Sequence, residues 1–364
     1  MLRILEPTGA LRGDLDPDIA PELAVRLYRA MHFQRVLDTR MLNLQRQGRI
    51  GFYGTATGQE ATTFGAVSAV DDSDWIFPAL REGGALLWRG FPLESYLCQL
   101  FGNLGDTQGG HQMPCHYADR SVNVVSWSSC IATQLPHAVG MSWAARHLHH
   151  PKIALAFLGD GATSSPDFHA AMNFAGVWKA PVVFVCQNNH WAISVPVTKQ
   201  TAVTELVLKA QGYGVPGVRV DGNDALAVHL SVREAASRAR LGNGPTFIEA
   251  VTYRMGGHSS SDDPTRYRAD DEVQTWGQRD PLVRYRKYLE QRGLWDESRE
   301  SAAVTEAGER IATAIKAAEA RESPALETMF DHVYAEVPWH LLEQREWLLS
   351  SGGPEGPSEG RFPL

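Results

Sequence analysis

The chain lacks the features that mark secreted and membrane-spanning proteins. It has 364 residues but only four cysteines, with no C-x-x-C pair. A disulfide framework is therefore excluded and reduced thiols are expected. No run of 18 or more apolar residues occurs, which argues against a membrane-spanning helix. The first twenty residues are acidic and have no apolar core, unlike a secretory signal or an arginine-rich transit peptide. We therefore expect a cytoplasmic protein with no membrane partner.

The chain also has fewer basic than acidic residues. The sequence has 34 lysines and arginines against 42 aspartates and glutamates, a formal net charge of −8 at pH 7. This balance argues against nucleic acid as a partner. The hydrophobic content of 43% is typical of globular proteins, so a chain of this length can bury a large core.

Short apolar runs alternate with helical patterns along most of the chain. The alternation predicts an α/β fold with a doubly wound, mostly parallel sheet and helices on both faces. Among the helices we expect one from Pro21 to about Gly48 and another over 203–213. We expect four parts: an N-terminal arm over 1–20, the α/β domain over 21–270, a C-terminal helical extension over 271–350, and a tail over 351–364.

The stretch from Lys152 to Ser194 is the most informative part of the sequence. It reads as an apolar strand, the turn Gly159-Asp160-Gly161, a helix, and a second apolar strand that ends at Asn188-Asn189. Ser165 and Pro166 fit the N-cap and first position of that helix. Ligands of such βαβ units sit beyond the carboxyl ends of the strands, so Asp160 and Asn189 should face one crevice.

These side chains suit a hard cation. Mg²⁺ prefers oxygen ligands and commonly takes one or two from protein and the others from phosphate and water. Asp160 offers a carboxylate oxygen, Asn189 an amide oxygen, and the turn after Asn189 a backbone carbonyl. Helix N-termini nearby favour phosphate groups. The residues themselves therefore predict a magnesium-diphosphate site, although an ordinary βαβ unit with turn residues at its strand ends has the same pattern.

Other polar residues leave a choice between function and structure. Gln59 and Glu60 are equally consistent with the polar N-terminus of a helix and with a functional site. Arg81, at the end of a predicted strand, is either solvated or a phosphate ligand. His258, in the loop after the last strong strand, is either a bystander or catalytic. The glycine-rich loop GNLGDTQGGHQMPCHYADRS has no second ligand cluster for zinc and is interpreted as a loop that covers a site.

The spacing of the central unit resembles the thiamine diphosphate motif, in which GDG is followed after 26 residues, here Ala162 to Gln187, by NN. Further blocks occur in order along residues 25–340: GRIGFYG, WIFPALREGG, GGHQMPCHY, SSCIATQLPHAVG, FLGDGATSS, CQNNHWAIS, EAVTYRMGGHSSSDDPTRYR and DPLVRYRKYLEQRGLW. Together they resemble the alpha subunits of the thiamine diphosphate-dependent 2-oxo acid dehydrogenase (decarboxylating) components.

The resemblance implies a thiamine diphosphate-binding fold and an activity. The activity would be oxidative decarboxylation of a small 2-oxo acid, with transfer of the acyl group to a lipoyl-bearing acyltransferase. GRIGFYG and QMPCHY are more similar to the branched-chain type, with a substrate such as 3-methyl-2-oxobutanoate. A pyruvate or acetoin dehydrogenase alpha subunit is the alternative.

The resemblance also implies roles for the matching residues. Asp160, the Asn189 side chain and the Trp191 carbonyl would bind Mg²⁺. His258 would be catalytic, next to the thiazolium, and the loop from Ser259 to Arg268 would order over the cofactor. The residues that would contact the cofactor are Arg81, Ser129, Ile131, Gly159, Asp160, Gly161, Ala162, Gln187, Asn189 and His258. The residues that match a monovalent-cation loop, for K⁺, are Ser128, Thr133 and Gln134.

Two departures from the family pattern are visible. Ser165-Pro166 stands where the family usually has Glu-Gly, and Leu80 stands where relatives often have Tyr. Each change removes a polar group that could contact the cofactor. Neither touches the expected metal ligands.

The resemblance further implies a second chain. The cofactor needs a carboxylate beside its pyrimidine ring, and in these enzymes the beta subunit supplies it. We therefore expect an alpha-two beta-two heterotetramer with sites between chains. A magnesium-dependent phosphatase and a catalytically silent regulatory relative are the competing functions. The phosphatase is disfavoured because no apolar strand ends in D-x-D-x-T.

Overall fold

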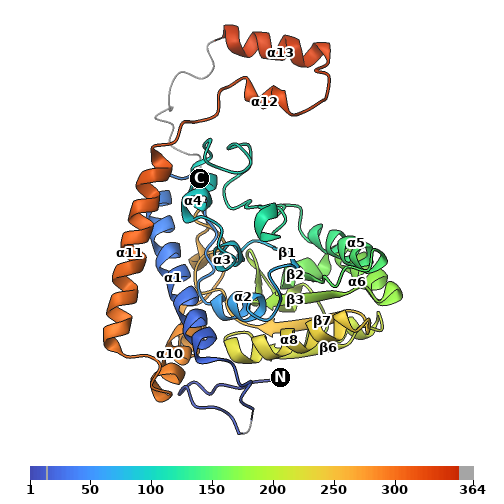
Figure 1. Ribbon diagram of the computed structural model, residues 1–364, viewed down its shortest axis with the longest axis vertical. Coiled ribbons are helices and arrows are strands. Elements are labelled where there is room, and N and C mark those ends of the chain that lie inside the picture. The colour runs from blue at the N-terminus through green and yellow to red at the C-terminus, as the bar shows by residue number, and fades with distance from the viewer. Residues whose placement is uncertain (14, 352–364) are drawn as a thin grey trace.

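The computed structural model describes residues 1–13 and 15–351. Its centre is a sheet of five parallel strands in the order β1-β2-β3-β7-β6 (Figure 1). The strands are β1 (Trp75–Phe77), β2 (Ala154–Gly159), β3 (Val182–Asn188), β6 (Gly217–Asp221) and β7 (Thr246–Val251). A separate antiparallel hairpin consists of β4 (Trp191–Ala192) and β5 (Val195–Pro196).

Helices of the described residues lie on both sides of this sheet, and α12 and α13 lie apart from it (Figure 1). They are α1 (Pro21–Arg46), α2 (Glu60–Val67), α3 (Gly84–Trp88), α4 (Leu93–Phe101), α5 (Gln134–His147), α6 (Pro166–Trp178), α7 (Leu208–Gln211), α8 (Ala225–Arg240), α9 (Asp270–Gly277), α10 (Pro281–Gln291), α11 (Glu297–Glu319), α12 (Thr328–Asp331) and α13 (Trp339–Ser350).

Both faces of the sheet are covered because successive strand residues point to opposite sides. In β2, Leu155 and Phe157 join the hydrophobic cluster that includes α1, α2 and α8, whereas Ala156 and Leu158 join the cluster that includes α5 and α6. All four side chains are fully or almost fully buried. The prediction of a doubly wound, parallel sheet is confirmed.

The start of α6 follows the predicted chemistry. Ser165 is the N-cap, and its side chain accepts a hydrogen bond from the backbone N–H of Asp167 at 3.3 Å. Pro166 occupies the first helical position, where its missing N–H costs nothing. The helix therefore starts normally with the Ser-Pro pair.

The helix predicted over 203–213 is wrong. The structure has only the short helix α7, and the segment before it is irregular. The backbone N–H of Val207 donates to the side chain of Glu249 at 3.0 Å, so it is not available for a preceding helical turn. Gly214, at φ +65°, closes the segment after α7.

The two ends of the described chain differ in how they contact the sheet. The N-terminal arm is held against it: Leu2 pairs with Val220, and the N–H groups of Ile4 and Leu5 donate to Asp224 at 2.7 and 2.6 Å. At the other end, α12 and α13 lie away from the sheet (Figure 1). The predicted tail, 351–364, falls outside the described residues apart from its first. None of the described helices combines the length and the hydropathy needed to cross a bilayer.

Candidate active site at the carboxyl ends of the strands

A cavity of about 650 Å³ opens at the carboxyl ends of β2 and β3. Every residue predicted from the sequence to contact thiamine diphosphate or Mg²⁺ lines it: Arg81, Ser129, Ile131, Gly159, Asp160, Gly161, Ala162, Gln187, Asn189, Trp191 and His258. These residues come from five separate segments of the chain. The parallel sheet brings them together because its strands all end at the same edge.

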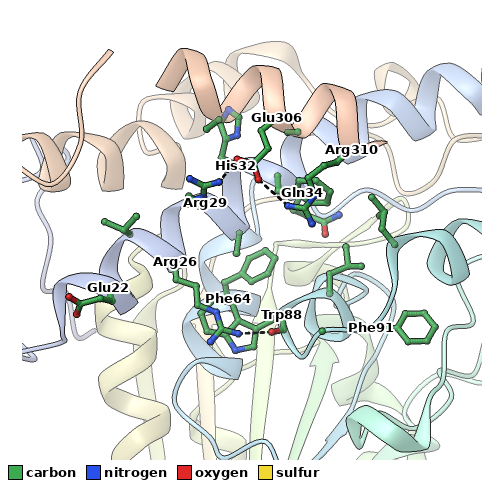
Figure 2. A pocket seen from close by; sticks show the side chains of 18 of the residues that line it. Glu22, Arg26, Arg29, His32, Gln34, Phe64, Trp88, Phe91, Glu306 and Arg310 are labelled. Atoms are coloured by element: carbon green, nitrogen blue, oxygen red, sulfur yellow. Dashed lines mark hydrogen bonds and ion pairs between the residues drawn. The ribbon is translucent and has the colours of Figure 1, made fainter. Parts of the chain in front are cut away.

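A second cavity, of about 910 Å³, lies away from that edge, among α1, α3, α11 and the start of α4 (Figure 2). Two of its arginines share one carboxylate, and a third bonds to a backbone carbonyl. Glu306 is shared between Arg29 and Arg310, and Arg26 donates to the carbonyl oxygen of Trp88 at 2.6 Å while covering its ring. None of the predicted site residues lines it.

Asp160 begins a 3-10 turn, Asp160–Ser164, directly after β2. Its carboxylate is buried and accepts a hydrogen bond from Gln200 Nε2 at 2.9 Å. Burial raises the pKa of Asp160 above its ordinary value, and hydrogen bonds from Gln200 and from the Asn189 backbone N–H oppose that rise. A Cβ on Gly161 would lie 2.6 Å from the Cβ of Ala192, so glycine is required for the turn to approach the β4–β5 hairpin.

Asn189 follows β3 and faces the same cavity as Asp160. Its Oδ1 accepts from the backbone N–H of Trp191 at 3.1 Å, and its Nδ2 donates to Gln59 Oε1 at 2.9 Å. The neighbouring Asn188 instead donates to the buried Glu249 at 2.8 Å. The expectation that Asp160 and Asn189 face one crevice is confirmed.

The backbone beside Asn189 is strained. His190 and Ile193 have φ values of +71° and +54°, a region that non-glycine residues seldom occupy. Across the cavity, Ala132 has φ +74°. Such conformations cost free energy and concentrate at functional sites, so the surrounding fold must hold these turns in place.

Arg81 places a buried positive charge in the cavity. Within the described residues, its guanidinium donates to the backbone carbonyl of Thr55 and to that of His258, the latter at 2.9 Å, and it forms no ion pair with a carboxylate. Burial and the nearby Arg254 lower the pKa of Arg81 to about 10, so it is still charged at neutral pH. A buried cation without an anionic partner is costly, and a phosphate ligand would offset that cost.

His258 lies beside Arg81. Burial, together with Arg81 and Arg254, lowers the pKa of His258 to about 4, so its imidazole is neutral at pH 7. Arg81 Nη2 lies 3.4 Å from Nδ1, which makes Nδ1 the acceptor and places the proton on Nε2. The backbone N–H of His258 donates to Asp262 at 2.6 Å, and Tyr267 also donates to Asp262. The loop after β7 is therefore ordered beside the cavity.

The opposite wall contains Ser129 and Ile131. Ser129 Oγ lies 3.1 Å from Nε2 of His116, and Ile131 is largely exposed. The three residues that match a cation loop hydrogen bond within the protein: Ser128 Oγ accepts from the N–H of Cys130, Thr133 donates to the carbonyl of Cys130, and Gln134 donates to that of Phe157.

Sequence reasoning missed several residues that line the cavity. Glu82 is buried and accepts from the N–H of Ala79 at 2.7 Å and from Gln187 Nε2. That bond leaves Gln187 Oε1 buried without a partner. Glu82 could have been suspected from its position directly after Arg81, whereas the contact of Gln200 with Asp160 has no local signal in the sequence.

The donor set determines which metals the cavity could hold. Among residues 1–13 and 15–351, no three His, Cys, Asp or Glu side chains form a metal-binding group. Beside Asp160 and Asn189 the donors are one carboxylate, one amide and backbone carbonyls, because the other carboxylate of the cavity, Glu82, accepts hydrogen bonds from Ala79 and Gln187. This all-oxygen set suits Mg²⁺ when a ligand supplies further oxygens.

Comparison with known proteins agrees with this geometry. The model of the family described as dehydrogenase E1 component matches residues 28–327. The chain is 44% identical to 2-oxoisovalerate dehydrogenase subunit alpha 1, mitochondrial, of Arabidopsis thaliana, over 94% of this chain and 73% of the relative. It is 42% identical to the corresponding alpha subunit of Caenorhabditis elegans, over 92% and 78%, and 40% identical to that of Homo sapiens, over 95% and 78%.

Proposed function

The chain belongs to the dehydrogenase E1 component family, and we propose that it is the alpha subunit of a thiamine diphosphate-dependent enzyme that oxidatively decarboxylates a branched-chain 2-oxo acid. The observation that carries this proposal is the placement of Asp160 and Asn189 on one cavity opposite a buried, unpaired Arg81. A cation site and an anion site thus face the same space.

The residues present fit a magnesium-bound diphosphate. Asp160, the Asn189 amide and the Trp191 carbonyl would hold Mg²⁺, and Arg81 would contact a phosphate oxygen. The buried carboxylate of Asp160 has no cationic partner at hydrogen-bond distance in the described structure, and a metal ion would stabilise its charged form. Gly161 and Ala162 would offer backbone groups to the diphosphate. K⁺ near Ser128 is a further part of the proposal.

Thiamine diphosphate supplies the carbanion and stores the electrons that decarboxylation leaves behind. The residues of this chain would bind the cofactor and orient it. Neutral His258 would offer Nε2–H as a hydrogen-bond donor to negative charge that develops near the thiazolium. Arg81 fixes both the tautomer of His258 and the position of its loop through the His258 carbonyl. Exposed Ile131 would pack against the pyrimidine side of the cofactor.

A second chain is part of the proposal. Three apolar side chains that line the cavity are more than half exposed: Met113 at 59%, Ile131 at 58% and Ile193 at 55%. The buried glutamate of the cavity, Glu82, already accepts hydrogen bonds from Ala79 and Gln187, on the Arg81 side. A beta subunit would cover the apolar rim and supply the carboxylate for the pyrimidine, in an alpha-two beta-two assembly.

The acyl group would pass to a lipoyl-bearing acyltransferase, which would approach over the loop from Ser259 to Arg268. The printed names of the relatives contain 2-oxoisovalerate and place those proteins in mitochondria. They support a branched-chain substrate here over pyruvate. The cytoplasmic location expected from the composition stays a prediction.

Steady-state rates of the chain mixed with its beta subunit test the proposal, with thiamine diphosphate and Mg²⁺ present. We expect kcat/KM for 3-methyl-2-oxobutanoate to exceed that for pyruvate by at least about tenfold. The chain without beta subunit should be inactive. Equal rates with and without the beta subunit would contradict the shared site, and a preference for pyruvate would contradict the substrate.

A further inference from the structure

Gln59 directly precedes α2, at its N-cap position, and lines the candidate active site. Its side chain is fully buried, but it makes no capping hydrogen bond to its own helix. Glu60 differs: it accepts from the N–H of Gly58 at 2.8 Å and pairs with Arg35. Glu60 therefore stabilises the turn before α2, whereas the side chain of Gln59 does not cap the helix.

The hydrogen bonds fix how Gln59 and Asn189 are oriented. The backbone N–H of Trp191 can only donate, so the Asn189 atom that it contacts at 3.1 Å must be the carbonyl oxygen. The NH₂ group of Asn189 then points toward Gln59. Gln59 must accept this hydrogen bond through its own oxygen, Oε1, at 2.9 Å. A flipped amide at either residue would oppose two donors or two acceptors.

This orientation has a cost. With Oε1 facing Asn189, Gln59 Nε2 is buried and has no hydrogen-bond partner among residues 1–13 and 15–351. A buried donor without a partner costs about 1–3 kcal/mol. An apolar side chain of the same length would remove this unpaired donor but leave another, Asn189 Nδ2, without its acceptor, so stability alone does not favour a glutamine here.

We propose that Gln59 is a positioning residue for the metal ligand Asn189, and this inference rests on the proposed function. Gln59 holds the Asn189 amide so that Oδ1, which keeps a second lone pair beyond its bond to Trp191, faces the cation next to Asp160. Without Gln59, only the bond from the backbone N–H of Trp191 holds the amide, which then turns more easily away from the orientation that presents Oδ1 to the cation. Partners that orient a ligand typically contribute 10- to 100-fold in metal affinity.

The test uses the complete assembly with its beta subunit and Mn²⁺ as a paramagnetic substitute for Mg²⁺. Free Mn²⁺ is followed by electron paramagnetic resonance in the presence of thiamine diphosphate. We expect Gln59→Met to weaken Mn²⁺ binding about tenfold or more. We expect Gln59→Glu, which keeps an acceptor oxygen in the same place, to stay within about threefold of the unmodified protein.

Thermal unfolding of the metal-free assembly separates positioning from a structural role. Gln59→Met removes one buried unpaired donor, Gln59 Nε2, and leaves another, Asn189 Nδ2, so its unfolding midpoint should stay about the same. The matched control is Thr62→Val, on the same helix, which removes a buried hydrogen bond to the carbonyl of Gly222. This variant should unfold at a lower temperature and bind Mn²⁺ normally.

Unchanged Mn²⁺ affinity in Gln59→Met would overturn the inference, as would equal losses of affinity in Gln59→Met and Gln59→Glu. A lowered unfolding midpoint with unchanged affinity in Gln59→Met would show a structural role instead. If the unmodified assembly itself bound no Mn²⁺ with thiamine diphosphate, the proposed function would fail as well, so the two failures are distinguishable.

Discussion

The two cavities of this chain differ in how well their polar groups are satisfied. Among the residues that the structure describes, the larger one, beside α1 and α11, leaves one buried lining atom without a partner, Gln34 Oε1. Within the same part of the chain, the smaller one, at the strand ends, leaves three: Gln59 Nε2, Gln187 Oε1 and Trp191 Nε1. Buried polar atoms are normally paired, so such exceptions indicate sites where function outweighs stability.

The charges show the same contrast. In the larger cavity Arg29 and Arg310 both pair with Glu306 and are exposed, so solvent also stabilises their charges (Figure 2). In the smaller cavity Asp160 and Arg81 are both buried, and neither has an oppositely charged hydrogen-bond partner among the described residues. Buried charge without such a partner, rather than volume, therefore distinguishes the candidate active site.

The largest expected effect is the loss of the proposed metal ligand Asp160. Asp160→Asn should reduce Mn²⁺ binding below detection and lower kcat/KM by about 10³-fold or more, because the charged ligand of the proposed site is gone. The metal-free protein should be no less stable, since the change removes a desolvated buried charge. Metal titration, kinetics and thermal unfolding of the assembly check this. Normal Mn²⁺ affinity in the variant would remove Asp160 from the site.

The next effect concerns the anion side of the same cavity. Arg81→Lys keeps the charge but loses the planar fork that reaches the carbonyls of Thr55 and His258. We expect thiamine diphosphate to bind about 10- to 100-fold more weakly, measured by calorimetry with Mg²⁺ and beta subunit. Unaltered affinity would mean that Arg81 supports the loop and does not contact the phosphate.

The pH dependence of stability is a smaller effect. The pKa of His258 is lowered from about 6.5 to about 4 in the folded chain. As the pH falls from 6.5 toward 4, the unfolded state gains a proton that the folded state excludes, so stability is lost. Relative to His258→Gln, the unmodified chain should lose on the order of 1 kcal/mol more between pH 7 and pH 5, after allowance for partial solvent exposure.

Urea unfolding at pH 7 and pH 5 measures this difference. Other buried histidines, such as His229, are present in both proteins and cancel in the comparison. Parallel losses in the two proteins would show that His258 is not held neutral by the fold.

The smallest effect is expected in the larger cavity. Glu306→Gln removes the carboxylate shared by Arg29 and Arg310, yet these pairs are exposed and contribute about 0–1 kcal/mol. We expect kcat/KM and Mn²⁺ affinity to stay within about twofold of the unmodified assembly. A tenfold loss of activity would break the contrast between the two cavities and assign a function to the larger one.

The strands and the helix around Asp160 can be predicted from the amino-acid sequence alone. An apolar run, two glycines, a Ser-Pro helix start and a second apolar run are local signals, because cap chemistry, backbone freedom and burial act over a few residues. These local signals predict that Asp160 and Asn189 lie at the ends of neighbouring strands. The same local reasoning failed over 203–213, where the distant Glu249 takes the N–H of Val207.

Only the tertiary structure decided which distant groups meet. Arg81 and His258 are 177 positions apart, and Gln59 and Asn189 are 130 apart. The strand order β1-β2-β3-β7-β6 that brings them together depends on how whole elements pack. No local sequence pattern predicts such a contact. Each of these side chains has many possible hydrogen-bond partners in water, and its partner is determined only when packing excludes the water.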